Sequence, residues 1–497
     1  MWKFFKKLPL VISIPSIFIL MMLIPALHGF YVGNEHHGRT FLYAVLLGIF
    51  SISFISLLIQ NESLSTHRHT QIWSFLAFFI GFPILLAIPF QEVLVDGDII
   101  NSYLDIVSVV TTTALPVFPT DVLSETLVLW RVCMGWSSGF LIWVFAWSLF
   151  AQLNLGGFER LGVERAQSTF SFNKTSTWND LPAEKFWHEA ERLAPIYFWI
   201  TACTSLLLLV ASGDPFFSVL RAMSTIATFG IEIPGHTGAG WPGEAILILI
   251  MVFALSRSTF SNLLSKTSSW RFVDDPELRV AAILIVLAML ILTSLSWSAK
   301  IQIDIGLEAI WGIFFTSISY LTTTGLTSTY IPNKLSESGS GEIIFMALAM
   351  LGGGVATTAG GIKLLRVYIL TRHCTAEIDR LMSPSQVKIG QGNNVFINYP
   401  NPTLACVFLI LFILVFAAIT LGLTLTGSSA GEALHLTLAT LTNTGPLAQE
   451  FGNAESVILE LGTKAKLLLV FAMVFGRLEV LALLALLNPE IYRYRTG

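Results

Sequence analysis

The sequence has 497 residues, of which 54% are hydrophobic and only 12% are charged. Its repeated apolar runs are long enough to cross the roughly 30 Å hydrocarbon layer of a bilayer, which excludes a soluble protein and predicts a polytopic membrane protein. The formal net charge of -4 at pH 7 gives no indication of nucleic-acid binding. The 4 cysteines are spaced too widely to predict a disulfide framework or a zinc site.

Apolar segments of spanning length recur along the whole chain. Each predicts a transmembrane helix, because in lipid every backbone polar group must be satisfied internally. We predict about ten such helices. In chain order they are Leu8–Tyr31, Phe41–Ile59, Ile72–Pro89, Leu127–Leu149, Ile196–Ala211, Ala245–Leu264, Val280–Trp297, Glu342–Leu370, Leu404–Leu425 and Ala465–Leu487. The first segment is too long for the apolar part of a signal peptide, so we expect it to be retained.

Charged residues between these segments predict the orientation, because short loops rich in Lys and Arg face the cytoplasm. Placing both chain ends inside leaves these basic residues inside: Arg160, Arg165, Lys174, Lys185, Arg192, Lys266, Arg271, Arg279, Arg372, Arg380, Lys388, Arg493 and Arg495. The segments then placed outside are acidic and contain Asp96, Asp98, Asp121, Glu125, Glu232 and Glu450. We therefore predict a multi-pass protein with its N- and C-termini in the cytoplasm.

Short semi-polar stretches follow several outward-going helices, and we expect their helical parts to be too short to cross a bilayer. Each predicts a short amphipathic helix, then small and hydroxyl residues, then an extended stretch. The four stretches are DIVSVVTTTAL ending at Leu115, DPFFSVLRAMSTIATFGI ending at Ile231, IGLEAIWGIFFTSISYLTTTGL ending at Leu326 and GEALHLTLATLTNTGPL ending at Leu447. We expect an acidic residue near the first turn of each helix, where it complements the helix dipole: Asp105, Asp214, Glu308 and Glu432. Such recurrence is an internal repeat.

The ends of these stretches predict an ion pathway. Irregular backbone is tolerated at membrane depth only where it lines a water-filled cavity or is buried in protein. Glycine permits positive φ, which can turn a carbonyl toward an ion and replace its hydration shell. One such turn between two helices would be ordinary, but four motifs at matching positions indicate a filter. We predict that its residues are Thr112, Thr113, Ala114, Thr228, Phe229, Gly230, Thr323, Thr324, Gly325, Asn443, Thr444 and Gly445. The cation is expected at Thr113, Phe229, Thr324 and Thr444.

Several motifs carry a family resemblance. They are TTTG at Thr322–Gly325, TNTGPL at Thr442–Leu447, LGGGVATTAGGIKLLR at Leu351–Arg366 and FGRLEV at Phe475–Val480. With its helix–pore–helix units, the chain resembles the Trk/Ktr/HKT superfamily of cation transporters, and in particular its bacterial TrkH branch, over nearly its whole length. The resemblance implies an all-α fold with pseudo-fourfold symmetry and two extra N-terminal helices. It also implies that the four polar motifs form one selectivity filter per subunit.

The first filter segment departs from the family pattern. Where the family usually has glycine, this chain reads Thr111-Thr112-Thr113-Ala114. In plant HKT relatives, a serine at this place is associated with sodium preference. Two alternatives therefore stay open, a potassium transporter and a sodium-permeable or poorly selective transporter of the same superfamily.

A glycine-rich break interrupts the eighth apolar segment, at Gly352, Gly353, Gly354, Gly360 and Gly361. Each Gly costs about 1 kcal/mol relative to Ala in a helix, so a hinge or loop is expected. The resemblance implies an intramembrane loop that blocks the pore. Lys363 follows the break and is predicted to be functional because it is ionisable within the membrane; the alternative is snorkelling to the cytoplasmic interface. For Arg477 the resemblance implies a basic residue beside the pore that repels cations, and the alternative is a structural ion pair.

The repeats divide the chain into five expected regions. Residues 1–66 form the two extra N-terminal helices and residues 67–152 form repeat 1. Residues 153–266 contain a cytoplasmic loop and repeat 2, residues 267–373 contain repeat 3 with the gating loop, and residues 374–497 contain a cytoplasmic loop and repeat 4.

We therefore predict the ion-translocating subunit of a Trk-type potassium uptake system in the bacterial cytoplasmic (inner) membrane. K+ or Na+ is the cargo, no cofactor is expected, and both channel-like flow and symport with H+ or Na+ stay open. An intramembrane enzyme is disfavoured, because the ionisable residues within the spans are mainly basic and offer no catalytic pair. The resemblance implies a homodimer and a cytosolic nucleotide-binding regulatory subunit similar to TrkA, contacted through the loops Gln152–Arg192 and Arg372–Gly392.

Overall fold

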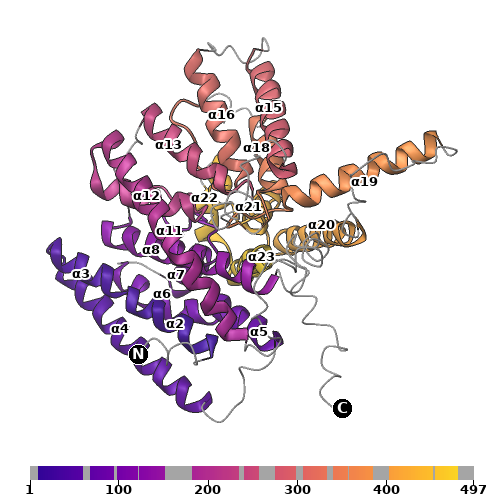
Figure 1. The fold of residues 1–497 in the computed structure, drawn as a ribbon. Helices are drawn as coiled ribbons and strands as arrows, with labels where there is room; N and C mark the ends of the chain where they lie inside the picture. The colour runs from indigo at the N-terminus through magenta and orange to yellow at the C-terminus, as the bar shows by residue number, and fades with distance from the viewer. Residues whose placement is uncertain are drawn as a thin grey trace, which may run out of the picture.

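The structure is a computed structural model of the chain. It describes residues 9–59, 68–94, 98–120, 122–150, 182–233, 240–256, 275–297, 306–332, 340–355, 357–383, 402–451 and 454–478. Within these ranges the regular structure is entirely helical (Figure 1), which confirms the all-α prediction.

The first helices form a hairpin beside the rest of the protein. Helices α2 (Leu10–Met21) and α3 (Leu23–Tyr31) follow one another as a single span, and α4 (Glu35–Ile59) packs against both of them. The hairpin, coloured indigo in Figure 1, lies on one side of the molecule. It corresponds to the two predicted N-terminal helices.

A long helix, a short helix and a further helix then recur four times in the described chain. The first unit contains α5 (Arg68–Ile80), α6 (Phe82–Val93), α7 (Ile99–Val110), α8 (Glu125–Phe145) and η1 (Ala146–Phe150); the second contains α11 (Pro182–Ser212), α12 (Pro215–Ile226) and α13 (Gly240–Phe253). The third contains α15 (Pro276–Trp297), α16 (Leu307–Leu321), α18 (Ser340–Leu351) and α19 (Leu364–Met382); the fourth contains α20 (Pro402–Leu425), α21 (Ala430–Leu441), η4 (Gly445–Phe451), α22 (Ala454–Glu460) and α23 (Thr463–Leu478). The short helices are α7, α12, α16 and α21.

In the described chain, 7 helices are long and apolar enough to cross a membrane. They coincide with all but three of the predicted spans. The exceptions are Ala245–Leu264, Glu342–Leu370 and Ala465–Leu487. Helix α13 ends at Phe253 and α18 ends at the glycine-rich break, whereas α23 ends where the described chain ends. These three predictions are therefore only partly represented by helix.

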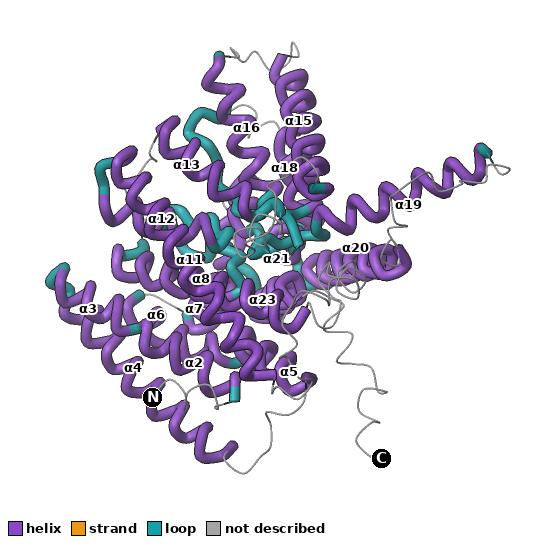
Figure 2. The backbone as a smooth tube through the Cα atoms, in the orientation of Figure 1, coloured by secondary structure: helices purple, strands orange, loops and turns teal. Residues whose placement is uncertain are grey.

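Burial distinguishes central from peripheral helices. We compare the most apolar 18-residue stretch of each spanning helix. In α8, 78% of the residues in this stretch are buried, whereas in α4, α15 and α20 only 22% are buried. Leu and Ile side chains on the peripheral helices are exposed, as expected for surfaces that face lipid. Figure 2 shows that the non-helical segments gather at the centre, surrounded by helices.

Two local predictions are wrong. Asp98, and not Asp105, caps α7: its Oδ1 accepts a hydrogen bond from Ile100 N at 3.4 Å, and Asp105 lies in the middle of the helix. The predicted contact loops are also partly helical. Helix α19 contains the residues from Arg372 to Met382 and projects from the body (Figure 1), and α11 begins at Pro182. Residues 151–181 and 384–392 of these loops lie outside the described residues.

Candidate ion-conduction site

The residues that follow the four short helices leave the helices with the same backbone geometry. We name them the first segment (111–115), the second segment (227–231), the third segment (322–326) and the fourth segment (442–446). In each segment, the first three amides donate to carbonyls four, three and five residues back. The third of these bonds are Thr113 N to Ser108 O at 2.7 Å, Phe229 N to Ser224 O at 2.9 Å, Thr324 N to Ser319 O at 2.9 Å and Thr444 N to Ala439 O at 2.8 Å. This is the bonding of a Schellman helix end, repeated four times.

The second residue of each segment is left-handed, as a Schellman end requires. The φ angles are 54° at Thr112, 49° at Thr228, 56° at Thr323 and 54° at Asn443. Glycine usually occupies this position, and threonine is β-branched and strongly disfavoured there. Sequence reasoning missed this feature, because only the asparagine is a residue type that tolerates left-handed backbone.

The glycines of the filter motifs have two different roles. Gly325 has a φ of 77°, as predicted from the motif. The same prediction is wrong for Gly230 and Gly445, which do not have positive φ. There a Cβ would overlap neighbouring backbone, namely the carbonyl oxygen of Thr324 for Gly230 and the Ala114–Leu115 peptide for Gly445. These two glycines permit close approach between segments.

Direct contacts bring the four segments together. Gly445 N donates to Thr113 O at 2.6 Å, and Asn443 Nδ2 donates to Thr113 Oγ1 at 2.8 Å, so the first and fourth segments are bonded. The close approach of Gly230 to Thr324 joins the second segment to the third. A Cβ on Gly325 would lie 3.0 Å from Pro446 Cγ, which places the third segment against the fourth.

The third residues of the segments are not equivalent in their side chains. In three segments, the hydroxyl of a threonine at this position lies close to that of the threonine two residues earlier. The distances are 2.8 Å for Thr111–Thr113, 2.9 Å for Thr322–Thr324 and 3.2 Å for Thr442–Thr444. The second segment has Ala227 and Phe229 instead, so it lacks this hydroxyl pair.

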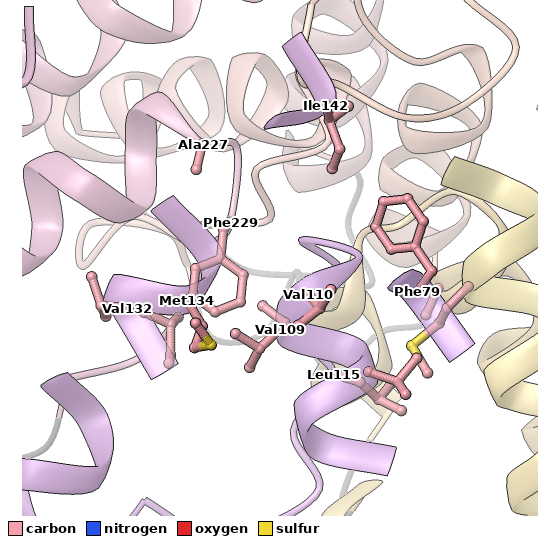
Figure 3. Packing of buried hydrophobic residues seen from close by; sticks show 14 of the residues in the cluster. Phe79, Val109, Val110, Leu115, Val132, Met134, Ile142, Ala227 and Phe229 are labelled. Atoms are coloured by element: carbon pink, nitrogen blue, oxygen red, sulfur yellow. The ribbon is translucent and has the colours of Figure 1, made fainter. Parts of the chain in front are cut away.

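The ring of Phe229 packs among apolar side chains. It is fully buried, and Figure 3 shows it in the apolar core with Met134 of α8 and Val109 of α7. A Cβ on Gly135 of α8 would lie 2.8 Å from the ring, so the ring occupies a notch at this glycine. Only the backbone of Phe229 is therefore available to an ion.

Ala114, at the position where the resemblance implies glycine, is buried and has a φ of 58°. Left-handed backbone costs a residue with a Cβ about 1–2 kcal/mol. The alanine therefore adopts the backbone region of its counterpart Gly325 at an energetic cost.

The glycine-rich break lies directly against the third and fourth segments. It interrupts the helix between α18 and α19, as predicted. Gly360 N donates to Thr323 Oγ1 at 2.7 Å, and a Cβ on Gly360 would overlap the carbonyl oxygen of Thr442. The other side of the break is held by Gly354 N, which donates to Ala254 O at 2.9 Å.

The two predicted basic gate residues are buried and bonded to backbone oxygens. Lys363 is 7% exposed and its Nζ donates to Ala359 O within the break, so it does not snorkel to the surface. Arg477 Nε donates to Thr111 O at 2.8 Å, its Nη1 donates to Thr358 O at 2.6 Å, and its Nη2 donates to Thr112 Oγ1. Arg477 thus links the first segment to the glycine-rich break.

Two further arginines support the short helices. Arg131 Nη2 of α8 forms a buried ion pair with Asp105 Oδ1 of α7 at 2.8 Å, a pairing for which the sequence carried no signal. Arg221 Nη1 of α12 donates to Ile231 O, at the end of the second segment, at 3.1 Å. No cluster of metal-binding side chains is found within the described residues.

Comparison with known proteins relates the chain to a family of transporters. Residues 245–490 match the family model TrkH, described as cation transport protein. The Trk system potassium uptake protein TrkH of Salmonella typhimurium is 28% identical over 397 residues, which are 77% of each chain. The Trk system potassium uptake protein TrkI of Halomonas elongata is 26% identical over 429 residues, covering 85% of this chain and 82% of that protein.

The fold also matches a solved structure. The crystal structure of the potassium transporter TrkH from Vibrio parahaemolyticus superimposes with a TM-score of 0.79 and 22% identity, covering 99% of this chain and 100% of that chain. The named relatives are uptake proteins and not enzymes. The chain belongs to the Trk-type cation transporters of the TrkH family.

Proposed function

We propose that this chain is the ion-translocating subunit of a Trk-type potassium uptake system. The observation that carries the proposal is the fourfold Schellman end, with its left-handed second residue, in segments that contact one another. Repeated irregular backbone at the centre of a membrane protein is expected where it lines an ion path. Potassium is the first choice for the cargo, because the relatives described above are named potassium uptake proteins.

The proposed filter consists of the second, third and fourth residues of the segments. The backbone carbonyls of Thr113, Phe229, Thr324 and Thr444 would replace part of the hydration shell of the ion. Thr113 O already accepts a hydrogen bond from Gly445 N. A carbonyl oxygen has two lone pairs, so this bond leaves one for a cation.

The proposed gate is the glycine-rich break together with Lys363 and Arg477. The bonds from Gly360 to Thr323 and from Arg477 to Thr358 support this proposal, because they hold the break against the filter. Movement of the break would have to release these bonds. Both side chains carry positive charge, which opposes cation passage in a low-dielectric pathway.

A sodium-permeable or poorly selective transporter is the second candidate. Ala114 favours it, because an alanine held at a φ of 58° is strained at one of four supposedly equivalent positions. Selectivity depends on the number and field strength of the coordinating carbonyls, so one displaced carbonyl would weaken it.

The proposals for the partners and the location rest on the resemblance to the family. We propose a homodimer in the bacterial inner membrane with both termini in the cytoplasm, and a separate nucleotide-binding regulatory subunit on the cytoplasmic side. The projecting α19 and the start of α11 would be part of the contact surface for this subunit. Both channel-like flow and H+- or Na+-coupled symport are consistent with this arrangement.

The deciding experiment is ion flux into proteoliposomes that contain only the purified chain. We expect uptake of K+ and Rb+ down an imposed gradient, and empty liposomes serve as the control. Replacing the K+ gradient by a Na+ gradient distinguishes the two candidates. Repeating the assay with and without a pH gradient tests coupling to H+, and the absence of any monovalent cation flux would refute both candidates.

A further inference from the structure

A buried carboxylate outside the proposed filter and gate holds the outer side of the third segment. Glu244 of α13 is 7% exposed. Its Oε2 accepts a hydrogen bond from Trp311 Nε1 at 2.7 Å, and its Oε1 accepts one from Thr329 N at 3.2 Å. Ser328 Oγ lies 2.8 Å from Oε1 and 2.9 Å from Oε2. Such charge-assisted bonds are stronger and shorter than neutral ones.

These three donors belong to a different unit from the carboxylate. Ser328 and Thr329 lie on the extended chain that leaves the third segment (residues 326–330), which we name the third limb, and Trp311 lies on α16. Glu244 comes from the second unit. The carboxylate therefore fastens the short helix and the limb of one unit to the neighbouring unit.

The third limb lies tightly on its own short helix. A Cβ on Gly312 would be 2.6 Å from Tyr330 C. Leu326 N donates to Ser319 Oγ at 2.6 Å, so the limb is also held at its inner end. Trp241 stacks on Trp311 with ring centroids 5.5 Å apart and an interplanar angle of 10°, which orients the indole N–H toward the carboxylate. The limb therefore has little freedom while Glu244 accepts these bonds.

We propose that Glu244 is a positioning residue that fixes the outer end of the third segment and thereby sets the preference of the filter among monovalent cations. This inference rests on the proposed function. Ser328 is three residues from Gly325, so a displacement of the limb is transmitted to the third segment along a few bonds of backbone. The preference of a filter for one cation over another depends on how its carbonyl oxygens are arranged. The attraction that a negative charge exerts on all cations does not depend on that arrangement.

The test compares Glu244→Gln with wild type in proteoliposomes, using the ratio of the KM values for Rb+ and K+. A glutamine has one acceptor oxygen and two N–H donors, so the N–H of either Trp311 or Thr329 would face another donor. We expect the ratio to change by about threefold, which corresponds to about 0.7 kcal/mol at 1.4 kcal/mol per tenfold and does not exceed what one hydrogen bond contributes. Loss of negative charge alone would alter both KM values equally and leave the ratio unchanged.

The matched control is Glu125→Gln. Glu125 is an exposed glutamate in the first turn of α8, the helix that follows the first segment as α13 follows the second. This variant should keep the wild-type ratio. Ser328→Ala removes the hydroxyl that bonds both carboxylate oxygens and should shift the ratio in the same direction as Glu244→Gln, so it decides the question if Glu244→Gln does not insert into the membrane.

The outcomes separate this inference from the proposed function. A wild type that transports K+ and Rb+, with unchanged ratios in both Glu244→Gln and Ser328→Ala, would overturn the positioning role and leave the proposed function standing. A wild type without monovalent cation flux would overturn the proposed function itself. A lowered maximal rate at an unchanged ratio would show that Glu244 is merely structural, which also overturns the inference.

Discussion

At the residue scale, the main feature of the site is the left-handed backbone of residues other than glycine. Thr112, Thr228 and Thr323 are β-branched, and each pays about 1–2 kcal/mol for positive φ. Such strain persists only where the surroundings over-determine it. The hydroxyl of Thr112 accepts a bond from Arg477 and that of Thr323 accepts one from Gly360 N. Two of the three strained threonines, Thr112 and Thr323, are therefore also points where the proposed gate holds the proposed filter, whereas the hydroxyl of Thr228 donates to Ala227 O.

Because the filter glycines have two different roles, Gly325 and Gly445 should differ in the substitutions that they tolerate. Val at either Gly325 or Gly445 should abolish K+ uptake. Alanine should separate the two positions: Gly445→Ala should abolish uptake, because its Cβ would overlap the Ala114–Leu115 peptide, whereas Gly325→Ala should retain part of it. Rubidium uptake in a potassium-uptake-deficient strain, normalised to the amount of inserted protein, measures both. Normal uptake by Gly445→Ala would refute the close approach.

Replacing Ala114 tests the position where the resemblance implies glycine. The left-handed φ of 58° costs alanine about 1–2 kcal/mol, and glycine adopts it freely. We expect the wild type to discriminate poorly between K+ and Na+, and we expect Ala114→Gly to sharpen its preference for K+. A difference of about 1.4 kcal/mol in binding free energy between the two ions corresponds to a tenfold difference in affinity. Reversal potentials at matched expression provide the measurement. A strongly K+-selective wild type that does not change on substitution would show that the other three segments set selectivity.

At the element scale, the glycine-rich break acts as a separate structural element between α18 and α19. It is bonded to Thr323 through Gly360, to Ala254 through Gly354 and to Arg477 through Thr358. These bonds come from different units of the chain. The position of the break is therefore set by the assembled protein and not by its local sequence alone.

Shortening the break between Gly352 and Gly361 should raise basal flux, because it removes the proposed plug without changing the four segments. Arg477→Ala should also raise basal flux, since it removes a positive charge and the bond to Thr358. Rubidium efflux from loaded proteoliposomes measures both variants. If neither conducts more than the wild type, the gating roles are wrong.

Arg477→Lys separates the charge of Arg477 from its geometry. Lysine keeps the positive charge but cannot reproduce the planar arrangement of donors that reaches Thr111 O, Thr112 Oγ1 and Thr358 O together. We expect intermediate basal flux if both the charge and the bridge contribute. Flux equal to that of wild type would assign the effect to charge alone.

At the scale of the whole molecule, the sequence was sufficient for the 7 spans that the described chain contains and for the four short helices with irregular ends. A bilayer requires apolar runs of fixed length, so the spans are visible in composition alone. Asp214 and Glu432 could likewise be placed at the starts of α12 and α21, where they now accept hydrogen bonds from backbone amides. The glycine-rich break was visible because few glycines are expected within a helix. The residue boundaries of the four units stay a prediction.

The contacts between units could not be predicted in this way. Arg477 and Thr111 are 366 residues apart in sequence, and Glu244 and Ser328 are 84 residues apart. A helical period places residues on a face but does not identify the facing helix. For this reason Asp105 was expected at a helix start, whereas it pairs with Arg131 inside the protein. The left-handed threonines were missed because their conformation is imposed by the surrounding structure against their own preference.

The bond between the first and the last units provides a test of the assembled ring. Asn443 Nδ2 donates to Thr113 Oγ1 at 2.8 Å, across 330 residues of sequence. Thr113→Val removes the hydroxyl at nearly constant shape, and Asn443→Gly removes the amide while preserving freedom for the φ of 54°. Because both variants delete the same bond, their effects on unfolding free energy should not add, with a coupling of about 0.5–3 kcal/mol.

The measurement is a double-mutant cycle on thermal unfolding in detergent, accompanied by the KM for Rb+ of each variant. The control cycle combines Thr113→Val with Thr204→Val, because the hydroxyl of Thr204 bonds to Ile200 O within α11. The control pair should be additive to within about 0.5 kcal/mol, since the two sites share no partner. Additivity in the Asn443 cycle as well would mean that this bond does not close the ring. The first and fourth segments would then be held together by the bond from Gly445 N to Thr113 O alone among the hydrogen bonds described between them.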